Sequence, residues 1–170
     1  MTPTLQGTRL RLRGLAADDA GALARILAEP SVRRFWGALE PGDLEPPVPG
    51  DLLVVDVDGM TAGLIQYSEV DDPDYRSASI DIALGTDWQG RGFGREALAL
   101  LIGWLVDVRG HHRLTIDPAA ANERAIRCYE AVGFERVGVM RQYERGEDGT
   151  WHDGLLMELL ADAWRATHGV

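Results

Sequence analysis

A glycine-rich segment at residues 89–95, Gln-Gly-Arg-Gly-Phe-Gly-Arg, stands between a predicted strand at 78–84 and a predicted amphipathic helix at 95–108. Glycine lets the backbone come close to a ligand, and the first N–H groups of a helix have no partner inside that helix. Because Arg91 and Arg95 add positive charge, this arrangement is typical of a phosphate or pyrophosphate site. The alternative is a glycine-rich turn that only reverses the chain.

Two common nucleotide-binding motifs do not fit this segment. Its glycine spacing differs from that of the dinucleotide fingerprint, and the P-loop requires a lysine, whereas the chain contains none. The sequence therefore disfavours the cofactors that those two motifs bind.

Strand-like and helix-like patterns alternate along the whole chain. Strands are predicted at residues 8–13, 52–57, 61–69, 78–84, 113–116, 135–143 and 151–159, and helical segments at 20–27, 31–36, 95–108 and 123–132. Asp58-Gly59 predicts a tight hairpin turn, while Asn122 and Gly133 are suitable as the cap and stop of the last helix. This order predicts a mixed α/β fold around one sheet, and 170 residues fit a single domain spanning 1–170.

The charge of the chain narrows the class of partner. There are 27 acidic residues against 17 cations, all of them arginine, which gives a net charge of −10. An acidic surface repels nucleic-acid phosphates and anionic lipids, so we expect neither nucleic acid nor a membrane as a partner. A cationic small-molecule amine or a basic peptide would suit this charge.

The cysteine count and the apolar stretches bear on the compartment. Cys128, the one cysteine, excludes an internal disulfide and a multi-thiolate metal site, and it is expected to be a small buried side chain rather than a nucleophile. No ligand spacing for a metal is present, so no metal is expected. The first residues lack a signal-peptide pattern, and the longest apolar stretch, near 97–106, is too short to span a bilayer. We therefore expect a cytoplasmic protein.

Two patterns in register resemble a known family. Gln89, Gly92 and Gly94 form Gln-x-x-Gly-x-Gly between a strand and a helix, and downstream Asn122 is followed by Tyr129 and a Gly-Phe pair. Together they resemble the two acetyl-CoA motifs of the GNAT N-acetyltransferases. The resemblance implies an α/β GNAT fold, with a single mixed and mostly antiparallel sheet, flanked by helices, whose central strands splay apart.

The resemblance also implies acetyl-CoA as the co-substrate and a set of residues that bind it. The segment 89–95 would hold the pyrophosphate, the backbone of 82–84 and the Asn122 side chain would hold the pantetheine arm, and Tyr129 would lie by the thioester sulfur. The implied cofactor-binding residues are Ile82, Ala83, Leu84, Gln89, Gly90, Arg91, Gly92, Phe93, Gly94, Arg95 and Asn122.

Narrower resemblances point two ways within that family. Residues 115–118 and 122–130 resemble aminoglycoside 6'-N-acetyltransferases, and Trp36 and Asp81 fall where those enzymes have an aromatic substrate contact and an active-site aspartate. Residues 10–13 and 148–153 are more similar to the branch that acetylates protein N-termini, including those of ribosomal proteins. The leading expectation is an antibiotic-resistance enzyme acting on an aminoglycoside. A protein N-terminal acetyltransferase, a non-catalytic CoA-binding sensor and an acyltransferase for a hydroxylamine such as a siderophore stay open.

The chemistry of amine acetylation assigns roles to three candidate catalytic residues. An ammonium must lose a proton before it attacks a thioester, and the thiolate needs an acid as it leaves. Asp81 lies in the predicted strand 78–84 and Asp117 stands at the end of the predicted strand 113–116, and the ends of these strands would face one crevice. We expect Asp81 to be the base or to orient the amine, Asp117 to bind a substrate ammonium, and Tyr129 to protonate the thiolate, in direct transfer without an acetyl-enzyme.

Each of these residues also has a purely structural interpretation. Asp81 could lie on a solvent-facing strand surface, with a water relay as the base, and Asp117 could form an Asp-Pro turn. Tyr129 and Trp36 could simply pack against the core. The acidic loops could be solvated or could steer a cationic substrate; their residues are Glu40, Asp43, Glu45, Glu69, Asp71, Asp72 and Asp74. A monomer or a homodimer is expected, because the apolar run at 155–160 fits either a core or a dimer edge.

Overall fold

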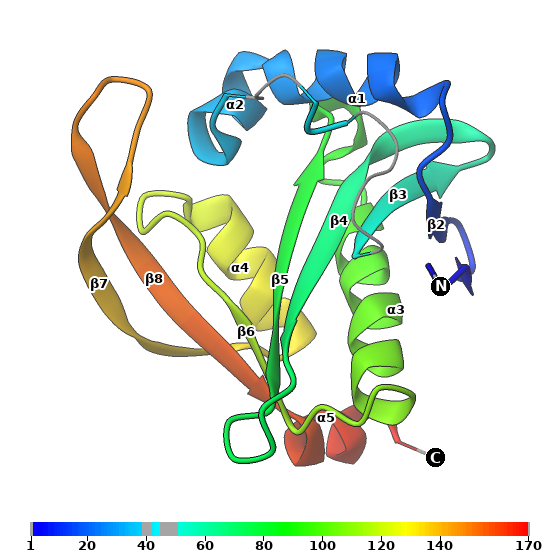
Figure 1. The fold of residues 1–170 in the computed structure, drawn as a ribbon, viewed down its shortest axis with the longest axis vertical. Coiled ribbons are helices and arrows are strands. Elements are labelled where there is room, and N and C mark those ends of the chain that lie inside the picture. The colour runs from blue at the N-terminus through cyan, green and yellow to red at the C-terminus, as the bar shows by residue number, and fades with distance from the viewer. Residues whose placement is uncertain (1, 39–41, 45–50, 170) are drawn as a thin grey trace. The chain divides into compact units, whose positions relative to one another are not determined.

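The computed structural model describes residues 2–38, 42–44 and 51–169, and within them it is a mixed α/β protein (Figure 1). The strands form one sheet in the order β1-β2-β3-β4-β5-β6-β8-β7. The elements are β1 (Leu5–Gln6), β2 (Arg11–Gly14), α1 (Asp19–Ala28), α2 (Pro30–Trp36), β3 (Leu52–Val57), β4 (Met60–Val70), β5 (Ser77–Leu84), the 3-10 turn η1 (Thr86–Trp88), α3 (Phe93–Asp107), β6 (Arg113–Ile116), α4 (Glu123–Val132), β7 (Glu135–Arg145), β8 (Trp151–Leu160) and α5 (Ala161–His168).

The chain is divided into two compact units, each built from two separate stretches. The first unit comprises Met1–Gln66 and Ile82–Leu101, and the second comprises Tyr67–Asp81 and Ile102–Val170. The strands β4 and β5 and the helix α3 each run from one unit into the other. The single domain over residues 1–170 stays a prediction.

The first unit contains an antiparallel run of strands from β1 to β4. All residues of β3 are buried, and all of them except Asp56 are apolar, as the predicted buried strand requires. Asp58 and Gly59 join β3 to β4 with φ angles of 52° and 83°, the left-handed pair that a two-residue hairpin turn requires. The hairpin predicted from Asp-Gly is therefore confirmed.

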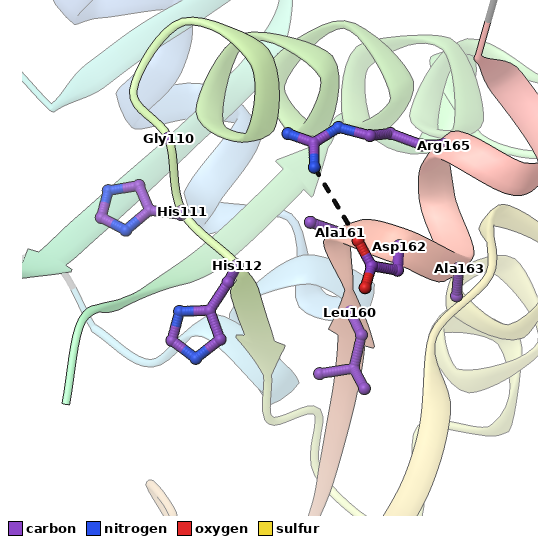
Figure 2. A pocket seen from close by; sticks show the side chains of 8 residues that line it. All are labelled: Gly110, His111, His112, Leu160, Ala161, Asp162, Ala163 and Arg165. Atoms are coloured by element: carbon purple, nitrogen blue, oxygen red, sulfur yellow. Dashed lines mark ion pairs between the residues drawn. The ribbon is translucent and has the colours of Figure 1, made fainter. Parts of the chain in front are cut away.

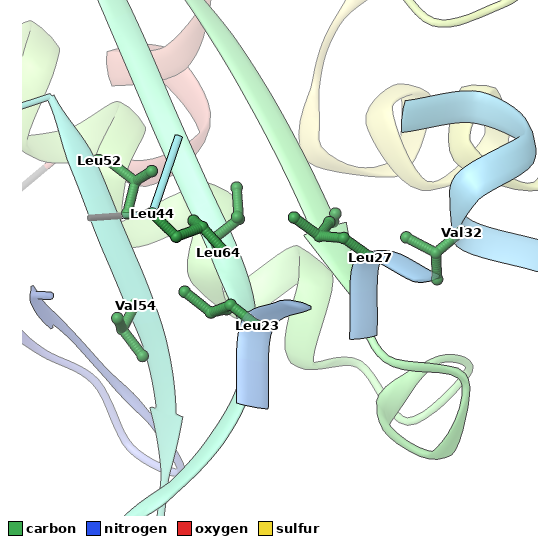
Figure 3. Close-up of a cluster of buried hydrophobic side chains, with 8 residues drawn as sticks. Leu23, Leu27, Val32, Leu44, Leu52, Val54 and Leu64 are labelled. Atoms are coloured by element: carbon green, nitrogen blue, oxygen red, sulfur yellow. The ribbon is translucent and has the colours of Figure 1, made fainter. Parts of the chain in front are cut away.

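The helix α1 closes one side of this unit because its apolar residues recur at helical spacing. Leu23 and Leu27 belong to a buried cluster that also draws on α2, β3 and β4 (Figure 3). Each buried leucine contributes roughly 1.5–3 kcal/mol of stability. Trp36, at the end of α2, is partly buried against the same cluster. The cluster consists of Leu23, Leu27, Val32, Leu44, Leu52, Val54, Leu64 and Ala83.

A buried ionic network holds β2, α1, β3 and β4 together. Arg13 donates two hydrogen bonds to Asp19, at 2.7 and 3.0 Å, and a third to Asp56 at 2.6 Å. Asp19 also accepts from the Thr61 hydroxyl at 2.7 Å, and Asp56 accepts from Arg11 at 3.0 Å. Asp19 and Asp56 are only 4 % and 2 % exposed, so their charges depend on these partners.

The second unit contains the strand pairs that run from β5 through β6 and β8 to β7. β5 and β6 are parallel, while β6–β8 and β8–β7 are antiparallel, so the prediction of a mixed and mostly antiparallel sheet is confirmed. β7 and β8 form the long hairpin in Figure 1. The helix α5 was not predicted, because its buried apolar residues are only Ala161 and Trp164 and give a short pattern.

Two predicted elements begin two or more residues away from where they begin in the structure. Of the strand expected at 8–13, only residues 11–13 are strand, as part of β2; residues 8–10 lie in a turn, where the Gly7 N–H donates to the Leu10 carbonyl, and β1 precedes this turn. The helix α3 begins at Phe93 rather than at residue 95, because Glu96 N–H already donates to the Gly92 carbonyl. The predicted loop is therefore shorter, and Gly94 lies in the first turn of α3.

We predict that Asp19→Ala will lower the free energy of unfolding by about 3–5 kcal/mol, because the variant removes the carboxylate that accepts two hydrogen bonds from Arg13 within the first unit. Urea titration followed by circular dichroism measures the change. Asp18→Ala is the matched control, because Asp18 is exposed and makes no side-chain cap on α1. An equal loss in both variants would contradict the importance of the network.

The same network predicts an acid limit to stability. The hydrogen bonds from Arg13 lower the pKa of Asp19 from 3.8 to about 2, despite burial. A carboxyl with a lowered folded-state pKa stabilises the fold above its unfolded pKa, and that stabilisation, about 2 kcal/mol here, is lost as the pH falls from about 4 to about 2. Unfolding free energies measured across this range should decline less steeply for Asp19→Asn than for the natural sequence.

Candidate active site

The glycine-rich segment leads from η1 into α3 within the first unit. The Gln89 side chain donates from Nε2 to the Leu84 carbonyl at 2.7 Å, so it closes the loop back onto the end of β5. Gly90 and Gly92 have φ angles of 71° and 84°, which L side chains rarely adopt. The glycines therefore serve the left-handed backbone that turns β5 into α3.

Arg9 supports this loop, although no motif or periodicity in the sequence points to it. Its Nη1 donates to the Arg91 carbonyl at 2.8 Å, and its Nε donates to Glu96 at 2.9 Å. Its guanidinium also lies over the Phe93 ring, 4.8 Å from the centroid. A Cβ on Gly92 would come within 3.0 Å of this guanidinium, so the loop and Arg9 are closely packed.

Of the two arginines within the segment, Arg91 contacts the loop itself and Arg95 is exposed. Arg91 donates to the Asp87 carbonyl at 3.2 Å, and its guanidinium lies 5.4 Å and 5.1 Å from the ring centroids of Trp88 and Phe93. Arg95 is exposed in the first turn of α3. The first N–H groups of a helix have no partner within it, so the start of α3 combines free donors with nearby positive charge. Such a start can bind a pyrophosphate.

The second unit holds the second family motif on α4. Asn122 caps this helix, because its side-chain Oδ1 accepts from the Ala125 N–H at 3.3 Å. Gly133 ends the helix with a φ of 125°. The predicted cap and stop are confirmed, and the amide NH2 of Asn122 is the group that can donate to a pantetheine carbonyl.

Tyr129 is buried on α4, with 7 % of its surface exposed, and it makes an edge contact with the Phe134 ring. Burial, together with the negative charges of Asp81 and Asp117 and the neighbouring Cys128, raises the pKa of Tyr129. The phenol therefore keeps its proton at neutral pH. That protonation state suits an acid for a departing thiolate and equally suits a packed aromatic side chain.

Asp117 follows β6 and accepts a hydrogen bond from a tyrosine that no sequence motif indicates. Tyr143 Oη, on β7, donates to Asp117 Oδ2 at 2.5 Å. The pKa of Tyr143 is raised to about 12, mainly by this hydrogen bond. Desolvation and the charges of Asp117, Asp81 and Glu144 add to the rise. Desolvation and the charges of Asp117 and Asp81 likewise raise the pKa of Glu144. In the second unit, Asp81 and Asp117 therefore raise the pKa of both phenols, and Glu144 contributes only to the raised pKa of Tyr143.

The predicted acidic loops differ in what their side chains do. Glu69 accepts two hydrogen bonds from Arg109 at 2.9 Å and lies 2.6 Å from the buried His111 ring nitrogen, while Asp71 pairs with Arg76. These contacts favour a structural role for both acids. Of the other acidic loop, Glu40 and Glu45 lie outside the described residues. Trp36, predicted to contact substrate, packs against the core cluster of the first unit, and its substrate role stays a prediction.

The second unit also contains a pocket of about 270 Å³, whose lining includes His111, the partner of Glu69 (Figure 2). It contains none of the predicted site residues, and its Arg165 and Asp162 form an ion pair at 3.9 Å. Over the described ranges, no three His, Cys, Asp or Glu side chains are grouped as metal ligands would be, and no helix is long and apolar enough to cross a membrane. The pocket is lined by Gly110, His111, His112, Leu160, Ala161, Asp162, Ala163 and Arg165.

Comparison with known proteins identifies the family. Residues 9–135 match the model of the acetyltransferase (GNAT) domain. The chain is 25 % identical to a spermidine N(1)-acetyltransferase of Escherichia coli K12, over 94 % of this chain and 90 % of that protein. It is 37 % identical to a kanamycin resistance protein of Rhizobium radiobacter, over 44 % of this chain and 68 % of that protein. A GNAT-family acetyltransferase structure from Bacillus anthracis superposes with a TM-score of 0.83, at 16 % identity, covering 94 % of this chain and 99 % of that one.

The chain therefore belongs to the GNAT acetyltransferases, as its two motifs indicate, and the expected GNAT fold is confirmed. Its reaction is the acetyl-CoA-dependent acetylation of an amine. The residues that bind acetyl-CoA and the identity of the amine stay predictions.

We predict that Gly92→Ala will weaken CoA binding by about tenfold. A left-handed alanine costs roughly 1–2 kcal/mol, so the free loop will relax and must be forced back into shape on binding. Isothermal titration with CoA measures this loss. Gly103→Ala is the matched control, because Gly103 lies in α3 at an ordinary φ with open space around it. Unchanged CoA affinity in Gly92→Ala would refute this loop as the pyrophosphate site.

Proposed function

We propose that this protein transfers acetyl from acetyl-CoA to a primary amine of a polycationic small molecule, first of all the 6'-amine of an aminoglycoside. The observation that carries the proposal is the hydrogen bond from Tyr143 to Asp117 in the second unit, together with the negative charges of Asp81 and Asp117, which raise the pKa of Tyr129, of Tyr143 and of the Glu144 carboxyl. Several carboxylates close together favour ligands with several ammonium groups, since charge-assisted hydrogen bonds are the strong ones.

In the proposed reaction, residues 89–95 hold the pyrophosphate, and the backbone of 82–84 and the Asn122 amide hold the pantetheine arm. Asp81, which directly precedes residue 82 in β5, takes a proton from the substrate ammonium, directly or through water. The freed nitrogen lone pair attacks the thioester carbonyl carbon. As the tetrahedral intermediate collapses, the C–S bond breaks, Tyr129 gives its proton to the departing thiolate, and the second proton that the nitrogen loses returns to the Tyr129 phenolate through water.

Asp117 has a different proposed role, that of binding a second ammonium of the substrate. Its Oδ2 already accepts from Tyr143, which leaves Oδ1 to accept from a ligand. A carboxylate engaged in this way favours substrates with more than one positive charge. A drug-modifying role in antibiotic resistance follows if the preferred polycation is an aminoglycoside.

A polyamine is the second candidate substrate, because the spermidine acetyltransferase matches this chain over nearly its full length. Linear polyamines and aminoglycosides both carry several ammonium groups, on a flexible frame in the first case and on a polyhydroxylated frame in the second. These ammonium groups are the feature that Asp81, Asp117 and Glu144 would recognise. The shorter match to the kanamycin resistance protein supports the aminoglycoside. The two substrates differ in shape, so kinetics separate them.

We predict that CoA release from acetyl-CoA, followed with a thiol reagent, will be fastest with polycations. The panel contains kanamycin, tobramycin, spermidine, a monoamine, and Ala- and Ser-initiated peptides. Turnover of the peptides alone would establish the protein N-terminal acetyltransferase instead. Binding of acetyl-CoA without thiol release for any amine would favour the CoA-binding sensor.

We predict that Asp81→Asn will lower kcat at neutral pH by about 10²-fold or more at saturating amine, in line with the contribution of a general base. Tyr129→Phe should lower kcat with little change in the KM for either substrate. Asp74→Asn, an exposed carboxylate in the turn before β5, is the matched control and should leave kcat unchanged. Full activity of Asp81→Asn would remove Asp81 from the proton transfer.

A further inference from the structure

A bulge in β7 places one tyrosine against the proposed ammonium ligand. The pairing of β7 with β8 shifts between Met140 and Glu144, so that three residues of β7 stand opposite Asp153 alone. Gln142, at the centre of the bulge, has a φ of 52°, and its N–H donates to Asp153 Oδ1 at 2.8 Å. Bulges bend a strand and re-aim its side chains. Here the bulge re-aims Tyr143.

The β8 strand leaves room for the Tyr143 ring. A Cβ built on Gly154 would lie 2.8 Å from Cδ1 of Tyr143 and 3.3 Å from its Cγ, so the ring lies directly over Gly154. Any larger residue at this position would displace the ring or the strand. Since Gly154 has no positive φ, the close approach of Tyr143 is what requires a glycine here.

The segment that carries Asp117 is fixed to the same part of β8. The Leu155 N–H donates to the Pro118 carbonyl, and the Ala120 N–H donates to the Asp153 carbonyl, both at 2.8 Å. Gly154 also forms an isolated bridge with Ala119. The bulge, Gly154 and the Asp117 segment are therefore connected through β8, and the bond from Tyr143 Oη to Asp117 Oδ2 joins the bulge to that segment directly.

We infer that Tyr143 is a positioning residue that fixes the Asp117 carboxylate for a substrate ammonium. The phenol stays protonated at neutral pH and occupies Oδ2, so Oδ1 is held in one orientation for the ligand. By orienting Asp117, Tyr143 favours polycationic amines as substrates, and it does not itself contact the acetyl group. The inference rests on the proposed function, in which Asp117 binds a second ammonium.

Tyr143→Phe is the direct test, because phenylalanine keeps the ring over Gly154 and removes only the hydroxyl. We expect the KM of the best polycationic amine to rise about tenfold, in the range of a lost hydrogen bond to a charged group, with kcat and the KM for acetyl-CoA nearly unchanged. A monoamine substrate should show no change in KM. Tyr75→Phe, an exposed tyrosine in the second unit, is the matched control.

A double-mutant cycle tests whether Tyr143 acts through Asp117. If it does, Tyr143→Phe will raise the KM no further in an Asp117→Asn background. Gly154→Ala keeps the hydroxyl and displaces the ring, so it should also raise the amine KM without lowering kcat. Additive effects of Tyr143→Phe and Asp117→Asn, or a loss confined to kcat, would overturn the positioning role.

The outcomes for the natural sequence separate this inference from the proposed function. If the enzyme acetylates peptides but no polycation, the proposed substrate class fails, and the role of Tyr143 fails with it. If it acetylates polycations and Tyr143→Phe leaves their KM unchanged, only the role of Tyr143 is overturned. Thermal unfolding of each variant shows whether a change in KM reflects a loss of fold.

Discussion

The reversal of the chain from β5 into α3 is the constraint on which the proposed cofactor-binding loop depends. The turn needs a left-handed backbone at Gly90 and Gly92, and it is closed by the bond from the Gln89 side chain to the end of β5. The same geometry leaves the first N–H groups of α3 without helical partners. The requirement for chain reversal and the capacity to bind an anion therefore come from one local conformation, so the structural and functional interpretations of these glycines are compatible.

The net charge of −10 takes on a more specific meaning in the structure. Many acids are already paired, such as Asp19 and Asp56 in the first unit and Glu69 in the second, so they contribute to folding rather than to ligand attraction. Within the described part of the chain, only three carboxylates raise the pKa of Tyr129 or Tyr143, namely Asp81, Asp117 and Glu144. Asp81 and Asp117 are also the two carboxylates predicted to act in catalysis. The proposed preference for a polycation thus depends on three carboxylates, not on the overall acidity of the chain.

Much of the fold could be predicted, because its signals are local. The buried strand β3, the Asp58-Gly59 hairpin and the helix α4 with its Asn122 cap each depend on residues within a few positions of one another. The prediction failed where the local signal was weak or interrupted. The helix α5 has too few buried residues to show a pattern, and the turn that ends at Leu10 divides a run that alternates like one strand.

The candidate site shows the same division between local and distant effects. The sequence alone determined the GNAT family, the glycine loop and the second motif around Asn122 and Tyr129, because the residues of each motif lie close together in the sequence. Only the tertiary structure placed Arg9 against Glu96, 87 positions away, and Tyr143 against Asp117, 26 positions away. Those contacts depend on the order of the strands, on the register of β7 on β8 and on the space that the missing side chain of Gly154 leaves. No periodicity or short motif encodes them, because they depend on which distant segments pack together.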